Sequence, residues 1–389
     1  MPAKLLPHLP HRALCLAGLL LAPALVLADC EVNGKPVNPS NGSTTQGLTG
    51  MMRCKDRDTG QMQREQELRD GKFVGLVRYY EQGRLKQEHS VNEKGNQQGR
   101  RREFGPEGQV LRDATYDNGD TVGLDRSFHP NGQLRRAAMR EAASRSDVAE
   151  AEFTPSGQLR DLRCADRPVL SPTVDDATLC GFAKPSDLTY FRDDGRPSAR
   201  ARFERGQRVR HEVLHDNGSV ARSSELKDNR RTERQFSREG VKRRETQRLV
   251  VERGTVVVVD QEFAESGQLS QDRRWSDSGE LQSESRYFLN GQLRSQSRYS
   301  GPPEARLLTT TGHDDTGALR SESTYRVDPR GRQQATGTHR TMNAQGKVVS
   351  EQTYNERGKL ARTREWDDNG QLLRDDAVFE DGSRKAFEK

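Results

Sequence analysis

Residues 275–299 read WSDSGELQSESRYFLNGQLRSQSRY and state one pattern twice within 25 residues. Trp275 and Tyr287 each precede a glycine by four positions, and Leu281 and Leu293 each follow a glycine by two. The residues between these landmarks are almost all Arg, Glu, Ser, Gln or Asp. A glycine held at a fixed place between two apolar residues is typical of a β-hairpin turn.

The pattern continues along the chain. Between residues 71 and 382, most glycines follow one another at steps of 11–13 residues, or about double that where one turn lacks its glycine. Direct Asn-Gly hairpin signals begin at Asn118, Asn131, Asn217, Asn290 and Asn369. A three-residue loop with glycine in the left-handed conformation would place the aromatic residue and the leucine opposite each other on one face.

A 12-residue period less such a loop leaves strands of about nine residues, roughly 30 Å long. Along a strand, the leucine after one glycine and the aromatic residue before the next have equal parity and are expected on one face. We therefore predict an all-β fold, an elongated and curved antiparallel meander of 12-residue hairpin half-repeats. Each half-repeat is expected to bury one aromatic and one aliphatic residue.

The N-terminal half adds a 24-residue unit in which every other turn reads Gly-x-x-x-Gly. The glycine pairs are Gly71/Gly75, Gly95/Gly99 and Gly119/Gly123. Alternating with turns such as YYEQGRL, they resemble the variant MORN repeat of bacterial proteins, over most of residues 60–389. This resemblance implies an antitoxin-like or immunity-like protein. Exported members resemble periplasmic immunity proteins that neutralise lipase or phospholipase effectors of type VI secretion.

Residues 1–28 are predicted to be a signal peptide cleaved after Ala28, because Lys4 and Arg12 precede an uncharged apolar run. That run is 15 residues long, shorter than the ~20 needed to span a bilayer as a helix. We therefore expect a periplasmic protein with no transmembrane segment. Lipidation at Cys30 is an alternative, which the preceding Asp29 disfavours.

The mature chain keeps four cysteines: Cys30, Cys54, Cys164 and Cys180. An even number in an exported protein predicts disulfides. Three pairings are possible, and Cys30–Cys54 with Cys164–Cys180 closes the shortest loops. A four-cysteine zinc site is the alternative, although it would want close Cys-x-x-Cys pairs, which the sequence lacks.

We expect five segments. Residues 1–28 are the signal peptide, 29–60 a disulfide-stapled N-terminal segment and 61–162 a first repeat block. Residues 163–186 form a stapled insertion, in which CADRPVLSPTVDDATLC interrupts the repeat, and 187–389 form a second repeat block.

Composition limits the function. Only 31% of residues are hydrophobic and 31% are charged, with a net charge of +6. Acidic and basic residues alternate rather than forming a basic face, which together with export argues against nucleic acid as a partner. The 51 arginines against 13 lysines favour bidentate pairing with carboxylates.

The residues offer little for catalysis. His211-Glu212-Val213-Leu214-His215 matches HExxH, but that zinc chemistry needs a helix. On the strand expected here the two imidazoles would lie ~13 Å apart. The sequence also lacks a Gly-x-Ser-x-Gly elbow, a phosphate loop and a dinucleotide fingerprint. We expect a non-enzyme without catalytic, metal or cofactor residues.

Two places are predicted to contact a partner. One is the 163–186 insertion, through Asp175 and Asp176, because non-repeat loops carry specificity. The other is Val256, Val257, Val258 and Val259, an apolar run without alternation that must be buried on both faces or covered by a partner. We expect a monomer that binds a protein, most naturally a secreted toxin or effector enzyme that it occludes. A general cell-envelope scaffold is the alternative.

Overall fold

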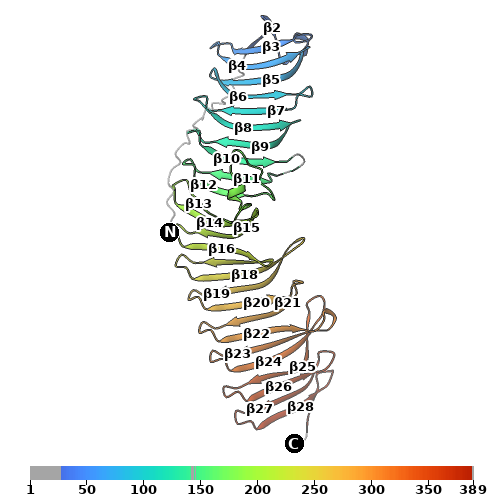
Figure 1. The fold of residues 1–389 in the computed structure, drawn as a ribbon. Coiled ribbons are helices and arrows are strands. Elements are labelled where there is room, and N and C mark those ends of the chain that lie inside the picture. The colour runs from blue at the N-terminus through green and yellow to red at the C-terminus, as the bar shows by residue number, and fades with distance from the viewer. Residues whose placement is uncertain (1–27, 142–143, 145, 388–389) are drawn as a thin grey trace, which may run out of the picture. The chain divides into compact units, whose positions relative to one another are not determined.

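A computed structural model describes residues 28–141, 144 and 146–387, so the predicted signal peptide lies outside the described residues except for Ala28. The chain divides into two compact units between Asp125 and Arg126. Its strands form two antiparallel sheets, each of which ends in two different edge strands and does not close on itself. Within each sheet, strands that follow one another along the chain are neighbours, except that β1 lies between β2 and β3 (Figure 1). The predicted all-β meander is confirmed.

The first sheet contains β1 (Ala28–Val32), β2 (Lys35–Val37), β3 (Gly50–Asp56), β4 (Met62–Arg69), β5 (Lys72–Glu81), β6 (Arg84–Val91), β7 (Gly99–Phe104), β8 (Val110–Asp117), β9 (Asp120–Phe128), β10 (Leu134–Arg140), β11 (Ala149–Phe153) and β12 (Leu159–Arg163).

The second sheet contains β13 (Ser186–Phe191), β14 (Pro197–Glu204), β15 (Gln207–Leu214), β16 (Val220–Lys227), β17 (Arg230–Phe236), β18 (Lys242–Val251), β19 (Gly254–Phe263), β20 (Leu269–Trp275), β21 (Leu281–Tyr287), β22 (Leu293–Ser300), β23 (Arg306–His313), β24 (Leu319–Val327), β25 (Gln333–Met342), β26 (Val348–Tyr354), β27 (Leu360–Trp366), β28 (Leu372–Val378) and β29 (Arg384–Ala386). The helical segments are α1 (Asp176–Leu179), between the sheets in sequence, and two single 3₁₀ turns, η1 (Gly42–Thr44) and η2 (Pro303–Ala305).

The turn between β20 and β21 has the predicted three-residue loop. Trp275 lies opposite Leu281 in the register. The Gly279 N–H donates to the Ser276 carbonyl at 2.9 Å, and the Ser276 N–H donates to the Glu280 carbonyl at 2.8 Å. Gly279 has φ +87°, which only glycine adopts without steric cost. The glycine period therefore marks positions where the chain must turn.

Other turns differ from that prediction. Glu204 pairs with Gln207, which leaves a two-residue loop of Arg205 and Gly206. Both loop residues have positive φ, 50° and 81°, as in a type I′ hairpin. A three-residue loop for every turn was therefore wrong, because a two-residue loop serves equally well where the first loop residue tolerates the left-handed conformation.

The expected strict alternation of faces is interrupted beside many turns. The register shifts between Arg274 and Trp275, so one residue of β21 is left unpaired. Tyr287 and Leu293 lie opposite each other next to a similar shift. A one-residue bulge exchanges the faces that follow it. The shared face inferred for the leucine and the aromatic residue of one strand assumed that no bulge intervenes.

The second glycine of the first Gly-x-x-x-Gly unit, Gly75, has a structural cause. Gly75 lies within β5 at φ +79°, where the register with β4 shifts. The Glu67 carboxylate fills the space beside it, and its Oε2 accepts the Leu76 N–H at 3.1 Å. A Cβ on Gly75 would lie 2.0 Å from that oxygen. The glycine makes room for a bulge closed by a carboxylate.

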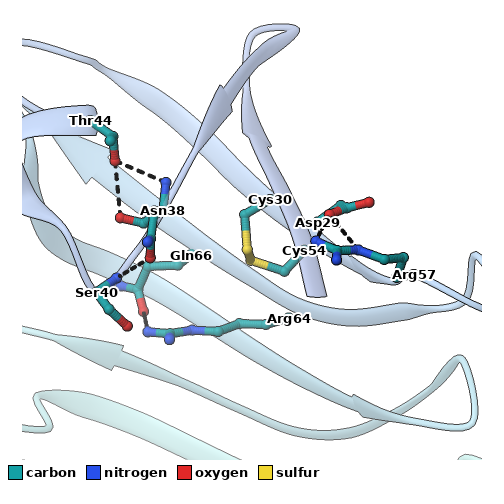
Figure 2. The surroundings of a disulfide bond; sticks show 9 residues. All are labelled: Asp29, Cys30, Asn38, Ser40, Thr44, Cys54, Arg57, Arg64 and Gln66. Carbon is teal, nitrogen blue, oxygen red and sulfur yellow. Dashed lines mark hydrogen bonds and ion pairs between the residues drawn. A yellow bond between two sulfur atoms is a disulfide. The ribbon is translucent and has the colours of Figure 1, made fainter. Parts of the chain in front are cut away.

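Apolar cores are small and local. In the N-terminal unit, Val32, Met52 and Leu68 are buried beside Cys30 and Cys54. Figure 2 shows this disulfide, which joins directly opposed residues of β1 and β3. The second disulfide joins Cys164 to Cys180. Both predicted pairings are confirmed.

Candidate interaction surfaces

The HExxH segment lies on a strand. His211 is in β15 and His215 follows its last residue. The His211 ring packs 6.3 Å from that of Tyr190, and burial followed by the charge of Arg208 lowers its pKa. His215 Nε2 lies 3.3 Å from the Phe236 carbonyl oxygen instead. Among the described residues, no group of three or more His, Cys, Asp or Glu could hold a metal ion.

The insertion between β12 and β13 is built into the fold. Leu170 is fully buried and Val174 nearly so. The Cys180 carbonyl accepts the Gly206 N–H at 2.8 Å, and the Gly181 carbonyl accepts the Arg205 N–H at 2.9 Å. The insertion therefore packs directly on the first hairpin turn of β14 and β15.

The two predicted aspartates of the insertion differ in environment. Asp176 is only 2% exposed, and its Oδ2 accepts the N–H groups of Val169 at 2.6 Å and Leu170 at 2.9 Å. Asp175 is exposed and caps α1, where it accepts the Thr178 N–H at 3.1 Å. Sequence reasoning treated both as surface residues. Only Asp175 offers its carboxylate to solvent, because Asp176 closes the loop from inside.

A shallow hollow of 310 Å³ lies beside Asp175. It is lined by Gln133, Leu134, Phe153, Gly157, Thr173, Val174, Asp175 and Leu179. The exposed carboxylate thus borders a depression with both apolar and polar lining, in which the insertion meets the hairpins of β10 to β12.

The valine run lies in β19. Val258 is 3% exposed, whereas Val256, Val257 and Val259 are half-buried. Val251, at the end of β18 in the same hairpin, is 38% exposed. Within this unit the hairpin is not buried on both faces, so apolar surface remains on it.

Further exposed apolar side chains lie at turns and near the last strand. Leu289, in the turn between β21 and β22, is 80% exposed. Leu373, Phe379 and Phe387 are about half exposed or more, in and around β28 and β29. Sequence reasoning did not single out these residues as surface, although Leu289 occupies a turn position at which the preceding repeat has the exposed Asp277.

Sequence reasoning also missed a ladder of alternating charges in the N-terminal unit. Arg53, Glu65, Arg78, Glu88 and Arg102 lie on five consecutive strands, β3 to β7, and each is directly opposite the next. The first three links measure 3.3, 3.4 and 3.3 Å between nitrogen and oxygen, and a shorter ion pair closes the fourth. Opposite charges that face each other across strands stabilise a sheet by about 0.2–1 kcal/mol per pair.

The second sheet contains a ladder of the same kind. Glu322, Arg340, Glu351, Arg364 and Asp375 succeed one another in register from β24 to β28. Glu351 accepts ion pairs from both neighbours, at 2.9 Å from Arg340 and 3.0 Å from Arg364. In the sequence, the ladder corresponds to a charge that alternates between acidic and basic from one strand to the next. The bulges make the number of residues between these charges vary, so the alternation has no fixed spacing.

In the ladder of the N-terminal unit the carboxylates are recessed and the guanidinium groups are more exposed to solvent. The side chain of Glu65 is 13% exposed and that of Glu88 12%, against 53% for Arg53 and 38% for Arg78. Short acidic side chains lie at the centre of the strands, and long arginine stems cover them. The pKa of Glu65 is lowered, first by the Tyr80 hydroxyl hydrogen bond and then by Arg53 and Arg78, which outweigh burial.

Comparison with known proteins identifies no family. No family model matches the chain, and no curated protein matches it. Solved structures with local likeness include TarM, at 15% identity, 24% of this chain, 18% of that chain and a TM-score of 0.19. A TcdB2-TccC3-Cdc42 complex matches at 11% identity, covering 86% of this chain and 18% of that chain, with a TM-score of 0.18.

A porin-like protein from Bacteroides uniformis matches at 8% identity, covering 52% of this chain and 86% of that chain, with a TM-score of 0.16. The chain spans less than a fifth of the length of the first two proteins. Scores this low carry no argument about fold or function. Among the described residues, no helix is long and apolar enough to cross a membrane.

Proposed function

We propose that this chain is an exported, non-catalytic repeat protein that binds a protein partner through its open sheets. Its most natural role is that of an immunity protein which occludes an antibacterial lipase or phospholipase effector in the periplasm. The two disulfides support an oxidising, exported compartment. The resemblance of the Gly-x-x-x-Gly units to the variant MORN repeat supports the choice of partner.

The observation that carries the proposal is that the strands display side chains on both faces. In β21, Ser285 is the only buried residue, and the remaining six are half-buried or exposed. Cross-strand ion pairs take the place of an apolar core, so the sheet holds its shape without a second layer over it. Such a surface suits broad contact with a partner.

The test is co-expression of the mature chain with a candidate periplasmic lipase or phospholipase effector. We expect the chain to restore growth and to elute with the effector as one complex in size-exclusion chromatography. Absence of both rescue and complex with the effectors encoded alongside it would refute the immunity role. Stable retention on cell wall or membrane in the absence of any effector would instead favour an envelope scaffold.

The residues beside the insertion can then be tested in that complex. Asp175→Arg reverses a charge at the rim of the hollow beside the insertion and also removes the cap of α1, and we expect it to weaken the complex. Asp193→Arg is the matched control, because Asp193 is an exposed aspartate at a turn that forms an ion pair with Arg160 at 3.3 Å. Equal affinity of the two variants would remove the insertion from the interface.

A further inference from the structure

The first three strands of the second sheet hold a small hollow lined by charged residues. Its volume is 250 Å³, and it lies over β13, β14 and β15. Its lining consists of three arginines, two carboxylates and three uncharged residues: Arg200, Arg202, Arg210, Asp187, Glu212, Leu188, Thr189 and Ala201. Ligand pockets for small molecules measure about 300–1,000 Å³, so this hollow has room for a single functional group or side chain.

The charge register is anomalous at this point. Arg202 lies directly opposite Arg210, whereas the ladders described above pair arginine with a carboxylate. Like charges directly opposite each other destabilise a sheet. Arg210 in turn faces Glu225, and Arg202 faces Asp187. Two guanidinium groups therefore stand side by side at the hollow.

The neighbouring carboxylates accept hydrogen bonds from only some of the side-chain N–H groups of Arg202 and Arg210. Arg202 donates from Nη1 to Asp187 at 2.6 Å and from Nε to Glu204 at 3.0 Å. Arg210 donates from Nη2 to Glu212. No hydrogen bond joins Arg202 Nη2, or Arg210 Nε and Nη1, to any described residue.

Arg200 is the freest of the three. Its Nη1 lies 3.8 Å from Glu212 Oε2, beyond hydrogen-bond distance, and its side chain is 57% exposed. Glu212 is 13% exposed and already serves Arg210. A guanidinium group presents five N–H donors in a planar fork that matches the two oxygens of a carboxylate or phosphate.

We propose that this hollow is a binding site for one oxyanion group, the chemistry carried by a carboxylate side chain of a protein partner. An anion held between Arg202 and Arg210 would screen their repulsion and receive the donors that Asp187, Glu204 and Glu212 leave unused. The further step, that an acidic side chain of the effector anchors here, rests on the proposed function. The site itself does not.

The site is tested without any partner, on the full mature chain at constant ionic strength. Glutarate and inorganic phosphate are titrated separately by isothermal calorimetry, to distinguish a carboxylate from a phosphate site. We expect saturable binding of one glutarate, weakened about tenfold or more in Arg202→Gln and in Arg200→Gln. Because the side chain of Arg200 makes no hydrogen bond to a described residue, Arg200→Gln keeps the test valid if Arg202→Gln fails to fold.

Arg248→Gln is the matched control. Arg248 also lies opposite another arginine, Arg231, and is not among the residues that line the hollow. Its affinity for glutarate is expected to equal that of the unsubstituted chain. Non-saturating binding, or equal weakening in Arg248→Gln and Arg200→Gln, would overturn the site. Tighter binding of phosphate than glutarate would overturn its assignment to a carboxylate. Neither result bears on whether an effector is bound, which the co-expression experiment decides.

Discussion

Replacing Glu65 with glutamine tests whether recessed carboxylates hold the sheet together. Glu65 accepts the Tyr80 hydroxyl at 2.7 Å and ion pairs from Arg53 and Arg78 at 3.3 and 3.4 Å. Glutamine keeps the shape and one acceptor oxygen but loses the charge. A hydrogen bond to a charged group contributes about 1.5–3 kcal/mol, and partly exposed ion pairs add about 0.2–1 kcal/mol each. We expect Glu65→Gln to destabilise β3 to β6 by about 2 kcal/mol.

The assay is hydrogen exchange with mass spectrometry, because a repeat protein can open locally and a single unfolding transition would average over its strands. A loss of 2 kcal/mol corresponds to about 30-fold faster exchange in peptides from β4 and β5, with no change in β24 to β28. Glu81→Gln is the control, since Glu81 is 65% exposed and, among the described residues, forms an ion pair with Lys86 alone. If exchange in Glu65→Gln and Glu81→Gln were the same, the reasoning would be refuted.

The same carboxylate predicts a pH dependence with a definite sign. The folded-state pKa of Glu65 lies below its ordinary value of 4.5, so the unfolded chain binds the proton more readily. The contribution of Glu65 is therefore complete above that value and is lost as the pH falls through the lower folded-state pKa. Protection factors, which divide out the slower intrinsic exchange at low pH, are therefore compared. Acidification from pH 5 to pH 3 is expected to lower protection in β4 and β5 more in the unsubstituted chain than in Glu65→Gln. An equal loss of protection in both would contradict it.

Three further predictions concern the fold. Leu170→Ala should cost about 2–5 kcal/mol, because Leu170 is fully buried in the insertion; circular dichroism during thermal unfolding would show it, and an unchanged midpoint would count against that packing. Gly75→Ala should cost about 1–2 kcal/mol, measured as faster exchange in β5, since φ is +79° there; Gly42→Ala, where a Cβ meets nothing within 4 Å, is its control. The double variant Cys164→Ser/Cys180→Ser should loosen the 16-residue loop by about 3 kcal/mol, seen as proteolysis within it; protection equal to the oxidised chain would be the contrary result.

The features of the fold that could be predicted from the sequence are those that depend on a single residue, such as the glycine of a turn. Gly279 must turn because only glycine takes its φ cheaply, and the pairing of Trp275 with Leu281 follows from that turn. The two-residue turns and the bulges were not predicted, because they depend on contacts with other parts of the chain. Arg205 accepts positive φ in a hairpin that the insertion holds by two backbone hydrogen bonds. The sequence of the turn itself does not predict these two hydrogen bonds from the insertion.

The candidate surfaces were harder to predict for a related reason. Asp175 and Asp176 are identical and adjacent in sequence, yet one caps a helix in solvent and the other is buried under the loop it closes. Exposure of a charged residue is a safe default in a core-forming protein, where burial of charge is costly. It fails here because two backbone N–H groups of the loop donate to one oxygen, Oδ2, of the buried carboxylate.

The low hydrophobic content, which by itself approaches that of disordered chains, is reconciled with order by the ladders. A disordered polyampholyte has the same charges without register. Here each turn fixes register, so that Arg340, Glu351 and Arg364 meet as neighbours on three strands. Each pair is weak, but along these ladders an added strand gains both a backbone hydrogen-bond ladder and an opposed pair of charges. The glycine period and the alternation of charge are therefore two parts of one mechanism, in which turns set the register and the register makes the charges attractive.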